Sequence, residues 1–405
     1  MRAKIAGPLA NTAAGAIAEQ VLRACVHCGM CNATCPTYQL TGDELDGPRG
    51  RIYLMKQVLE GEPAGRLSQT HLDRCLGCRA CETTCPSGVD YHSLYDVARP
   101  AVDQAAPRPW KERLVRWAIR AAFVHPRRLS ILMSLARRVR FAAPSSLRGK
   151  LAAPRSPGPT PAPRHGRRMS LLHGCVQAAA APAINAANRR VFDSVGIDLV
   201  ETPAVGCCGA LSFHNGSQAE GRAIARRNID AWCAELDAGA EAIVANASGC
   251  AAFIRDYGDI LADDPHYAAR ARRVAGAVKD PVEILKANPP KAVRAPLSAR
   301  VAVHPPCTLR NGPELADAPA ELLATLGFEP QPIRDAHLCC GSAGAYSLLQ
   351  PKFANELRKA KVEALTGGEP QEILTANIGC MMHLAEASPV PVRHWIEAVD
   401  EVVSR

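Results

Sequence analysis

The sequence contains no apolar run long enough to cross a membrane. A spanning helix needs about 18 or more consecutive apolar residues, and no run of that length occurs among the 405 residues. The first twenty residues do not resemble an export signal either, because Pro8, Asn11 and Thr12 interrupt any apolar core. These two absences predict a cytoplasmic protein, one that could lie peripherally on the inner face of the cytoplasmic membrane.

A dinucleotide-binding fingerprint is also missing. No Gly-x-Gly-x-x-Gly motif opens a strand–helix–strand unit, so we predict no flavin and no NAD of the chain's own. Two-electron chemistry on an organic substrate belongs to such a cofactor. We therefore expect no catalytic residue in the substrate-oxidising sense, and we assign that chemistry to a partner protein.

Acidic residues are scarce between residues 108 and 168. This segment carries 16 Lys and Arg residues and a single acid, a local net charge of +15 in a chain whose total is +9. Residues 110–141 show two helical patterns that break at His125-Pro126. Residues 144–168 are rich in proline, which predicts an extended linker.

The first of these helical patterns mixes arginine with bulky apolar residues. It contains Arg113, Arg116 and Arg120 together with Trp110, Leu114 and Trp117. This composition is typical of a helix that lies on an anionic surface such as a membrane. A solvated linker, or an arm that docks on an acidic partner, are the alternatives.

Cysteine is abundant, and eight of the 17 cysteines form two runs with the same spacing. The runs are Cys25, Cys28, Cys31 and Cys35 before Pro36, and Cys75, Cys78, Cys81 and Cys85 before Pro86. Cys-x2-Cys-x2-Cys-x3-Cys-Pro is the bacterial ferredoxin pattern for [4Fe–4S] clusters. Structural zinc sites are the alternative, but zinc would use two Cys pairs and leave cysteines over. Disulfides are disfavoured without a secretory segment. Two [4Fe–4S] clusters are therefore predicted.

The fourth cysteine of each run is predicted to serve the other cluster. Three sulfurs of one tight loop can wrap one side of a cage, and in two-cluster ferredoxins the fourth ligand is exchanged between the runs. We assign Cys25, Cys28, Cys31 and Cys85 to one cluster and Cys35, Cys75, Cys78 and Cys81 to the other. Between the runs, a helix is predicted over 51–59; Arg51 begins it and Arg49 lies two residues before it. They are either solvated surface or positive charges near the cages, which would raise the reduction potential. We favour the second.

The second half of the chain is an internal duplication. Cys175, Cys207 and Cys208 recur as Cys307, Cys339 and Cys340 at an offset of 132, and Cys250 recurs as Cys380 at an offset of 130. Strands are predicted at 169–172, 242–245, 301–303 and 373–375, and helices at 218–236 and 351–365. This alternation predicts α/β domains with parallel sheets, whose sites gather at the carboxyl ends of strands. The four cysteines of each repeat should converge there as additional metal or redox groups.

The remaining cysteine and two histidines have weaker signals. Cys233 has no counterpart in the other repeat, and we predict a buried small residue on a helix. His173 and His304 each precede the first cysteine of a repeat. They are hydrogen-bond donors to metal ligands, proton relays or structural histidines, and the sequence leaves these alternatives open.

Four segments resemble the iron–sulfur subunits of bacterial glycolate oxidases. They are Cys25-Val-His-Cys28-Gly, the run from Thr41 to Leu54, Asn246-Ala-Ser-Gly-Cys250 and Thr375-Ala-Asn-Ile-Gly-Cys380. The resemblance implies an α+β multidomain fold, a helical bacterial-type two-cluster ferredoxin module followed by two duplicated α/β CCG domains. We expect the ferredoxin-like domain at 1–105, a basic helical and Pro-rich linker at 106–168, the first CCG domain at 169–297 and the second at 298–405.

The resemblance also implies a place in an oxidoreductase complex. A separate FAD flavoprotein would oxidise glycolate to glyoxylate, and this chain would pass the electrons to quinone or another acceptor, with no role for nucleic acid. An iron–sulfur subunit for lactate or glycerol 3-phosphate, a CCG-type disulfide reductase and a metal or redox sensor are the other readings.

One departure from related CCG domains concerns their last motif. Heterodisulfide reductase relatives end the domain in Cys-x2-Cys, whereas the earlier position here is Ala247 in one repeat and Asn377 in the other. This argues against five-thiolate noncubane clusters. Four cysteines could still hold a cubane, another centre or none.

Overall fold

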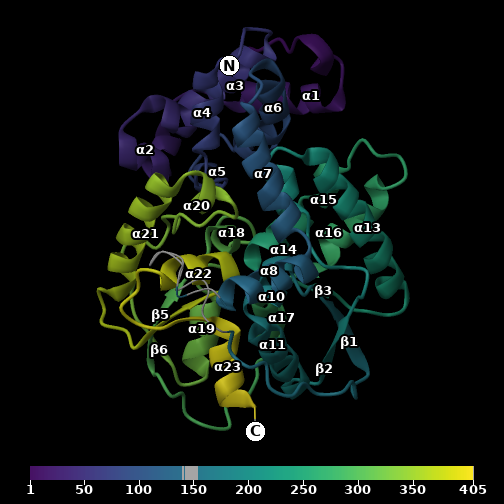
Figure 1. Cartoon of the computed structure of the whole chain (residues 1–405), viewed down its shortest axis with the longest axis vertical. Helices are drawn as coiled ribbons and strands as arrows, with labels where there is room; N and C mark the ends of the chain where they lie inside the picture. Colours follow the sequence, from purple (N-terminus) through teal and green to yellow (C-terminus); the bar gives the residue numbers. More distant parts are fainter. Residues whose placement is uncertain (139–140, 142–153, 405) are drawn as a thin grey trace.

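The computed structural model describes residues 1–138, 141 and 154–404. A helical N-terminal part lies at one end of the long axis, and two lobes, each with its own sheet, lie side by side below it (Figure 1). The prolines between residues 154 and 163 lie in a stretch without helix or strand, as expected for a linker. The part of the linker prediction that concerns residues 144–153 lies outside the described residues.

Short helices build the N-terminal part. They are η1 (Gly7–Leu9), α1 (Ala13–Ala24), η2 (Met30–Thr34), α2 (Pro36–Thr41), η3 (Glu44–Asp46), α3 (Pro48–Leu59), α4 (Arg66–Asp73), α5 (Ala80–Thr83) and α6 (Tyr91–Ala105). The helix predicted over 51–59 begins three residues earlier, because Pro48 has the φ angle that a first helical turn needs. Leu22, Met55, Leu72 and Leu94 are wholly buried between α1, α3, α4 and α6. Each contributes about 1.5–3 kcal/mol of burial free energy.

Two basic helices, α7 (Trp110–Phe123) and α8 (Pro126–Arg138), leave the N-terminal part and run along the first lobe. Arg116 is buried and donates to Asn215 Oδ1 (2.8 Å) and Asp73 Oδ1 (3.2 Å). Arg120 Nε donates to Glu220 Oε2 at 3.1 Å. The expectation that these two arginines lie on an external anionic surface is therefore wrong, because the helix turns them inward to pair with internal polar groups.

Each lobe contains a four-stranded parallel sheet. The first has the order β2-β1-β3-β4 and comprises β1 (Arg167–Leu171), β2 (Ile197–Glu201), β3 (Ile243–Val244) and β4 (Val278–Lys279). The second has the order β6-β5-β7-β8 and comprises β5 (Arg300–His304), β6 (Glu329–Pro330), β7 (Glu372–Thr375) and β8 (Val392–His394). The identical orders show that the repeat in sequence is a repeat in fold.

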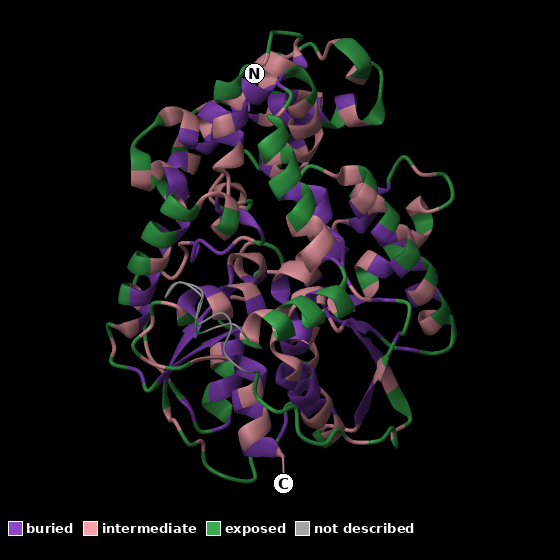
Figure 2. Cartoon of the chain, viewed as in Figure 1, coloured by how far each residue is buried: buried purple, intermediate pink, exposed green. Residues whose placement is uncertain are grey.

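Helices cover both sheets. In the first lobe they are α10 (Cys175–Ala180), α11 (Pro182–Ser194), α12 (Ala210–His214), α13 (Gln218–Asp237), α14 (Ser248–Arg255), α15 (Tyr257–Ile260), α16 (Ala268–Ala277) and α17 (Pro281–Ala287). In the second they are α18 (Cys307–Arg310), α19 (Ala318–Thr325), α20 (Tyr346–Leu349), α21 (Pro351–Thr366), α22 (Ile378–Ala385) and α23 (Trp395–Val403). Apart from the first residues of β1 and β5, the central strands are buried (Figure 2), as parallel strands covered on both faces should be.

The two lobes share one core. Phe192 from the first lobe and Trp395 from the second belong to the same buried apolar cluster, where α11 and α23 meet. Arg190 pairs with Asp400 across this contact at 2.6 Å, and His394 Nε2 lies 2.9 Å from the Asn246 carbonyl oxygen. The duplicated domains therefore pack against each other through a continuous core. Over the described ranges, no helix has both the length and the hydropathy to span a membrane.

Candidate metal centres

Five cysteines line a small cavity in the N-terminal part, whose volume is about 30 Å³. They are Cys25, Cys28, Cys31 and Cys85, together with Cys81 of the second run. Burial raises the pKa of the Cys31 thiol, and the charges of Cys25, Cys85 and Cys28 raise it further, to about 11. The structure thus places the last cysteine of the second run beside the first three of the first run. We call these four residues the first crossed set.

The other four cysteines of the runs are neighbours in the same way. Burial raises the pKa of Cys81, and the charges of Cys78, Cys75 and Cys35 raise it further. Tyr91 donates its hydroxyl hydrogen to Cys75 Sγ at 3.7 Å. We call Cys35, Cys75, Cys78 and Cys81 the second crossed set. Four converging thiols are the donors that a [4Fe–4S] cage requires, so both sets suit such clusters.

The chain wraps the first crossed set tightly at Gly29. Gly29 has φ = 86°, a left-handed conformation that glycine adopts without strain. A Cβ added there would lie 2.5 Å from Arg49 Nη1, so the guanidinium covers this loop closely. Arg49 also lines the cavity of the first crossed set and pairs with Glu44 at 2.6 Å.

Arg51 lies beside the second crossed set, with 1% of its side chain exposed. Its Nη1 is 3.8 Å from Cys35 Sγ, and its Nε donates to the His71 carbonyl oxygen at 2.8 Å. Burial alone would lower the pKa of Arg51, but the surrounding thiols, Tyr91 and Asp46 raise it overall. The alternative of a solvated Arg51 is excluded by this burial.

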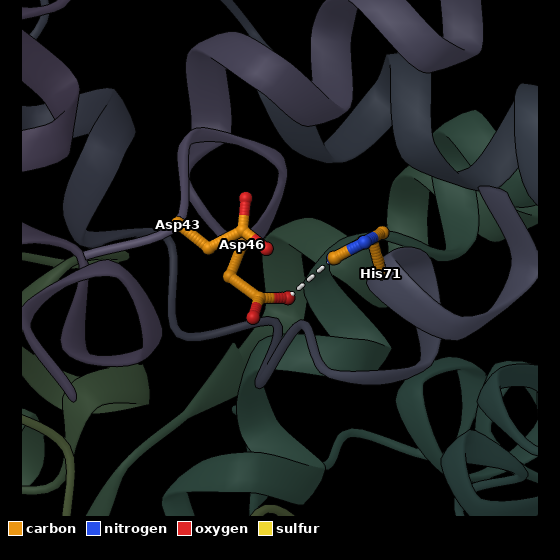
Figure 3. A group of neighbouring side chains, drawn as sticks. All are labelled: Asp43, Asp46 and His71. Carbon is orange, nitrogen blue, oxygen red and sulfur yellow. Dashed lines mark hydrogen bonds and ion pairs between the residues drawn. The ribbon is translucent and has the colours of Figure 1, made fainter. Parts of the chain in front are cut away.

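Asp46 balances that buried charge. With Asp43 and His71 it forms a group that could resemble a cation site (Figure 3). However, Asp46 lies 2.7 Å from His71 Nδ1, 2.9 Å from Arg74 and 3.7 Å from Arg51. Its oxygens are therefore engaged by protein cations, and the group is an ion-pair network that supports the second crossed set.

In each lobe the cysteines follow strands on either side of the point where the strand order reverses. Cys175 follows β1 and Cys250 follows β3, while Cys207 and Cys208 lie beyond β2. Ligand sites of open parallel sheets form at this position. A hydrogen bond with Cys207, then burial and the charge of Cys250, raise the pKa of Cys175. Hydrogen bonds with Cys207 and Cys250, and then burial, raise the pKa of Cys208. These four form the first cysteine-rich site.

The second lobe repeats this arrangement. Cys307 follows β5 and Cys380 lies in α22 after β7. Cys339 is hydrogen bonded to Cys307 and Cys340, and Cys340 to Cys380. These four form the second cysteine-rich site. The expectation that four cysteines per repeat come together agrees with both lobes.

In the second lobe, Asn377 stands where heterodisulfide reductase relatives have a fifth cysteine, and its side chain has a structural role. Asn377 caps α22 by accepting from the Gly379 backbone N–H at 2.8 Å, and its Nδ2 donates to Ser248 Oγ at 3.2 Å. Ala247 occupies the equivalent place before α14 and is buried. Neither residue can supply a thiolate, so each site offers four.

The other predicted residues are structural. Cys233 is buried in α13 within an apolar cluster, which confirms that prediction. His304 is buried with Nδ1 3.0 Å from Thr375 Oγ1, and burial, Lys361 and Arg310 lower its pKa to about 3. A histidine that stays neutral in this way is unsuited to proton relay near pH 7. His173 lies on the surface side, 3.2 Å from Glu201.

Sequence reasoning missed Lys361. It lies in α21 on the same face as Ala354, Leu357 and Leu365, and is 3% exposed. The signal was a lysine at the i+4 position of an apolar helical stripe. Lys361 is among the charges acting on Cys380.

Comparison with known proteins agrees with this layout. A family model described as a 4Fe-4S dicluster domain matches residues 21–89, and one described as a cysteine-rich (CCG) domain matches 169–255 and 301–385. The glycolate oxidase iron-sulfur subunit of Escherichia coli (strain K12) is 46% identical over 406 residues, covering 100% of both chains. The chain belongs to the glycolate oxidase iron–sulfur subunit family. The probable glycolate oxidase iron-sulfur subunit of Bacillus subtilis (strain 168) is 33% identical over 400 residues, 90% of this chain and 89% of that protein.

More distant relatives cover only part of this chain. Lactate utilization protein A of Geobacillus kaustophilus (strain HTA426) is 24% identical over 243 residues, 58% of this chain and 98% of that protein. Membership of the glycolate oxidase iron–sulfur subunit family confirms the predicted fold class and the prediction that the chain carries [4Fe–4S] clusters. It also places the chain among the subunits of oxidoreductases with an iron–sulfur electron-transfer role.

Proposed function

We propose that this chain is the electron-transfer subunit of a glycolate dehydrogenase complex. An FAD flavoprotein partner oxidises glycolate to glyoxylate, and this subunit carries the electrons to quinone. The observation that carries the proposal is the 46% identity to the Escherichia coli subunit over the whole of both chains. We also propose that the subunit has the four domains or linkers expected from the sequence, at 1–105, 106–168, 169–297 and 298–405.

The proposed ligands are the two crossed sets. Cys25, Cys28, Cys31 and Cys85 would hold one [4Fe–4S] cluster, and Cys35, Cys75, Cys78 and Cys81 the other. When bound, such clusters accept and release single electrons, which divides the two electrons of a flavin into two transfers. The crossed ligation holds the sets close together, and Arg49 and Arg51 place positive charge beside each set.

The test is co-purification with the proposed flavoprotein partner, followed by flavin and metal analysis. The anaerobic complex is then titrated with glycolate, lactate and glycerol 3-phosphate while the iron–sulfur absorbance is monitored. Bleaching by glycolate in preference to the others supports the proposal. Lactate is the second candidate substrate, because a lactate utilization protein matches 58% of this chain. Dithiol-dependent disulfide reduction by the chain alone would instead favour a disulfide reductase.

We further propose that the outer face of α7 and α8 contacts an anionic membrane. Trp110 and Trp117 are 67% and 58% exposed, and Leu114, Ile131 and Leu135 are also exposed on these helices. Exposed cations on the same two helices are Lys111, Arg113, Arg127, Arg128 and Arg138. Each cation near an anionic leaflet contributes about 1 kcal/mol. This contact would place the subunit at the inner face of the cytoplasmic membrane, near the quinone pool.

Co-sedimentation with phosphatidylserine and phosphatidylcholine vesicles tests this contact. We expect the complex to bind only the anionic vesicles, less at high salt, and a Trp110→Ser, Trp117→Ser variant to lose binding. Leu297→Ser, at an 85% exposed leucine away from these helices, is the matched control. If the purified complex ignores anionic vesicles at low salt, the outer face is not a membrane contact.

A further inference from the structure

The two cysteine-rich sites contain equivalent thiols in different surroundings. In the first lobe, Val124 and Ile224 pack on Cys207 in a small buried apolar cluster. Pro126 covers the preceding loop, since a Cβ added to Gly206 would lie 3.4 Å from Pro126 Cγ. The corner between α7 and α8 therefore closes the first cysteine-rich site with apolar side chains.

The second cysteine-rich site instead adjoins the second crossed set. Asn311, directly after α18, donates from Nδ2 to the Cys78 carbonyl oxygen at 2.7 Å. Burial and then the charge on Cys307 raise the pKa of the Cys78 thiol. The Cys339 thiol likewise has Cys78 among its charged neighbours. Thiols from the two sets thus influence one another directly.

Further contacts hold the second lobe against the start of the second cysteine run. Tyr346 donates its hydroxyl hydrogen to the Arg74 carbonyl oxygen at 3.1 Å, one residue before Cys75. The Arg74 guanidinium lies 5.1 Å from the centre of the Phe353 ring. The residue equivalent to Tyr346 in the first lobe is His214, which faces Asp96 of α6 at 3.8 Å. The first lobe reaches this run at another point, where Asp256 pairs with Arg79. Among the described residues, the contacts at Arg74 come from the second repeat.

The two sites also differ in buried charge. Gly341 packs on Ala354 and Leu357 as Gly209 packs on Gly221 and Ile224, an offset of 133 between α21 and α13. By that offset, the counterpart of Lys361 is Asn228, a neutral residue that donates to the Cys207 carbonyl oxygen at 2.8 Å.

Lys361 is arranged as a cation. Its Nζ donates to the carbonyl oxygens of Asp335 (2.8 Å) and Ala336 (3.3 Å), acceptors that suit an ammonium group. Burial lowers the pKa of Lys361, and the charges of Cys339 and Cys340 oppose that shift. A buried cation beside thiolates stabilises an anionic metal centre and favours its reduced form.

We propose that the second cysteine-rich site, with Lys361 as its fixed positive charge, binds a thiolate-ligated metal centre that exchanges single electrons with the centre held by the second crossed set. Each transfer moves one electron from the reduced dicluster module to the oxidised centre and needs no bond change. Among the described residues, the first cysteine-rich site has neither the hydrogen bond to Cys78 nor a buried lysine. The positive charge that acts on Cys207 is that of Arg227, which is exposed. The inference rests on the proposed electron-transfer function and adds the place where electrons leave the dicluster module.

The test uses the full chain in complex with its flavoprotein, purified anaerobically. Two pairs of variants are matched: Cys380→Ser with Cys250→Ser, and Lys361→Met with Lys359→Met, the latter an exposed lysine of the same helix. The readouts are iron atoms per chain and the reduction midpoints of each EPR signal. Lys361→Arg retains the charge and should restore the wild-type midpoint.

We expect iron in excess of the eight atoms of two [4Fe–4S] clusters and a third signal coupled to the dicluster signals. Cys380→Ser should remove this signal and Cys250→Ser should keep it. Lys361→Met should shift its reduction equilibrium about tenfold toward the oxidised form, or about 59 mV for one electron, while Lys359→Met stays within twofold.

Three outcomes would overturn the inference: no third signal in the wild type, its loss in Cys250→Ser but not in Cys380→Ser, or equal midpoints in Lys361→Met and Lys359→Met. The dicluster signals and their reduction by glycolate are measured in the same samples. If they are present, such an outcome removes the inference alone. If they are absent from the wild type, the proposed function fails as well.

Discussion

Replacing Arg51 by Met should lower the reduction potential of one cluster and leave the other unchanged. Arg51 is buried, its Nη1 lies 3.8 Å from Cys35 Sγ, and its Nη2 lies 3.7 Å from Asp46 Oδ1. Met fills a similar volume but carries no charge. The change therefore removes one cation from the second crossed set and leaves the first crossed set intact.

The magnitude follows from the 3.8 Å separation. At an effective dielectric constant of about 20, two unit charges at that distance interact with about 4 kcal/mol. The cluster charge is spread over four thiolates, so the share on Cys35 is about 1 kcal/mol, equivalent to about 45 mV for one electron. Removing one partner of a buried ion pair also destabilises the fold by about 3 kcal/mol, near the lower end of the usual range because Asp46 keeps Arg74 and His71.

The assay is an EPR-monitored redox titration of the full chain, with iron content and urea unfolding measured on the same preparations. Arg49→Met is the matched control, because Arg49 lies over Gly29 in the first crossed set. We expect Arg51→Met to shift only the cluster of the second crossed set and Arg49→Met only that of the first. Arg51→Lys should keep most of the potential while losing the forked hydrogen bonds.

Two results would refute this reasoning. One is an Arg51→Met protein that retains its iron and has wild-type potentials for both clusters. The other is a shift confined to the cluster of the first crossed set, which would mean that Cys35 does not belong to the set that Arg51 contacts.

Three further predictions concern the cysteines and one buried acid. Cys85→Ser should damage the cluster of the first crossed set and spare that of its own sequence neighbours, which Mössbauer spectra can distinguish; loss of the second cluster instead would make the crossed assignment wrong. Cys340→Ser should abolish electron transfer to quinone analogues, and Cys208→Ser should reduce it less, with dicluster iron retained; unchanged turnover in both would limit these pairs to packing. Asp73→Asn should cost about 2 kcal/mol at pH 7, because Arg99, Arg108 and Arg116 outweigh burial and lower the pKa of Asp73 to about 2. This stabilisation is present above pH 4 and is lost as the pH falls toward 2, so the difference in urea unfolding between wild type and variant should shrink there; a difference independent of pH would contradict it.

The sequence predicted the regular elements well where hydrophobic periodicity was strong. The helices expected at 218–236 and 351–365 end one residue later in the structure, and the strand expected at 301–303 extends by one residue at each end. The duplication allowed weak signals to support each other, since four of the five cysteines of the first repeat recur in the second at an offset of 132 or 130. The proximity of the crossed sets then followed from known ferredoxin spacing.

The sequence could not predict contacts between its parts. Arg116 and Arg120 have the spacing of an exposed basic helix, and only tertiary contacts with Asp73, Asn215 and Glu220 decide that they turn inward. Lys361 is the charged member of a buried helical stripe that also contains Ala354, Leu357 and Leu365. Its proximity to the second cysteine-rich site depends on how α21 packs across the sheet, which no local pattern records.

The most direct test of the proposed role is whether glycolate reduces the clusters held by the two crossed sets. The anaerobic complex of this chain with its flavoprotein is mixed with glycolate, frozen at intervals and measured by EPR. We predict that signals of two magnetically interacting [4Fe–4S] clusters appear at least as fast as turnover, and that Cys85→Ser alters them. If glycolate is oxidised at the full rate by an added quinone while the clusters of this chain never become reduced, the electrons bypass the subunit and the proposed role is wrong.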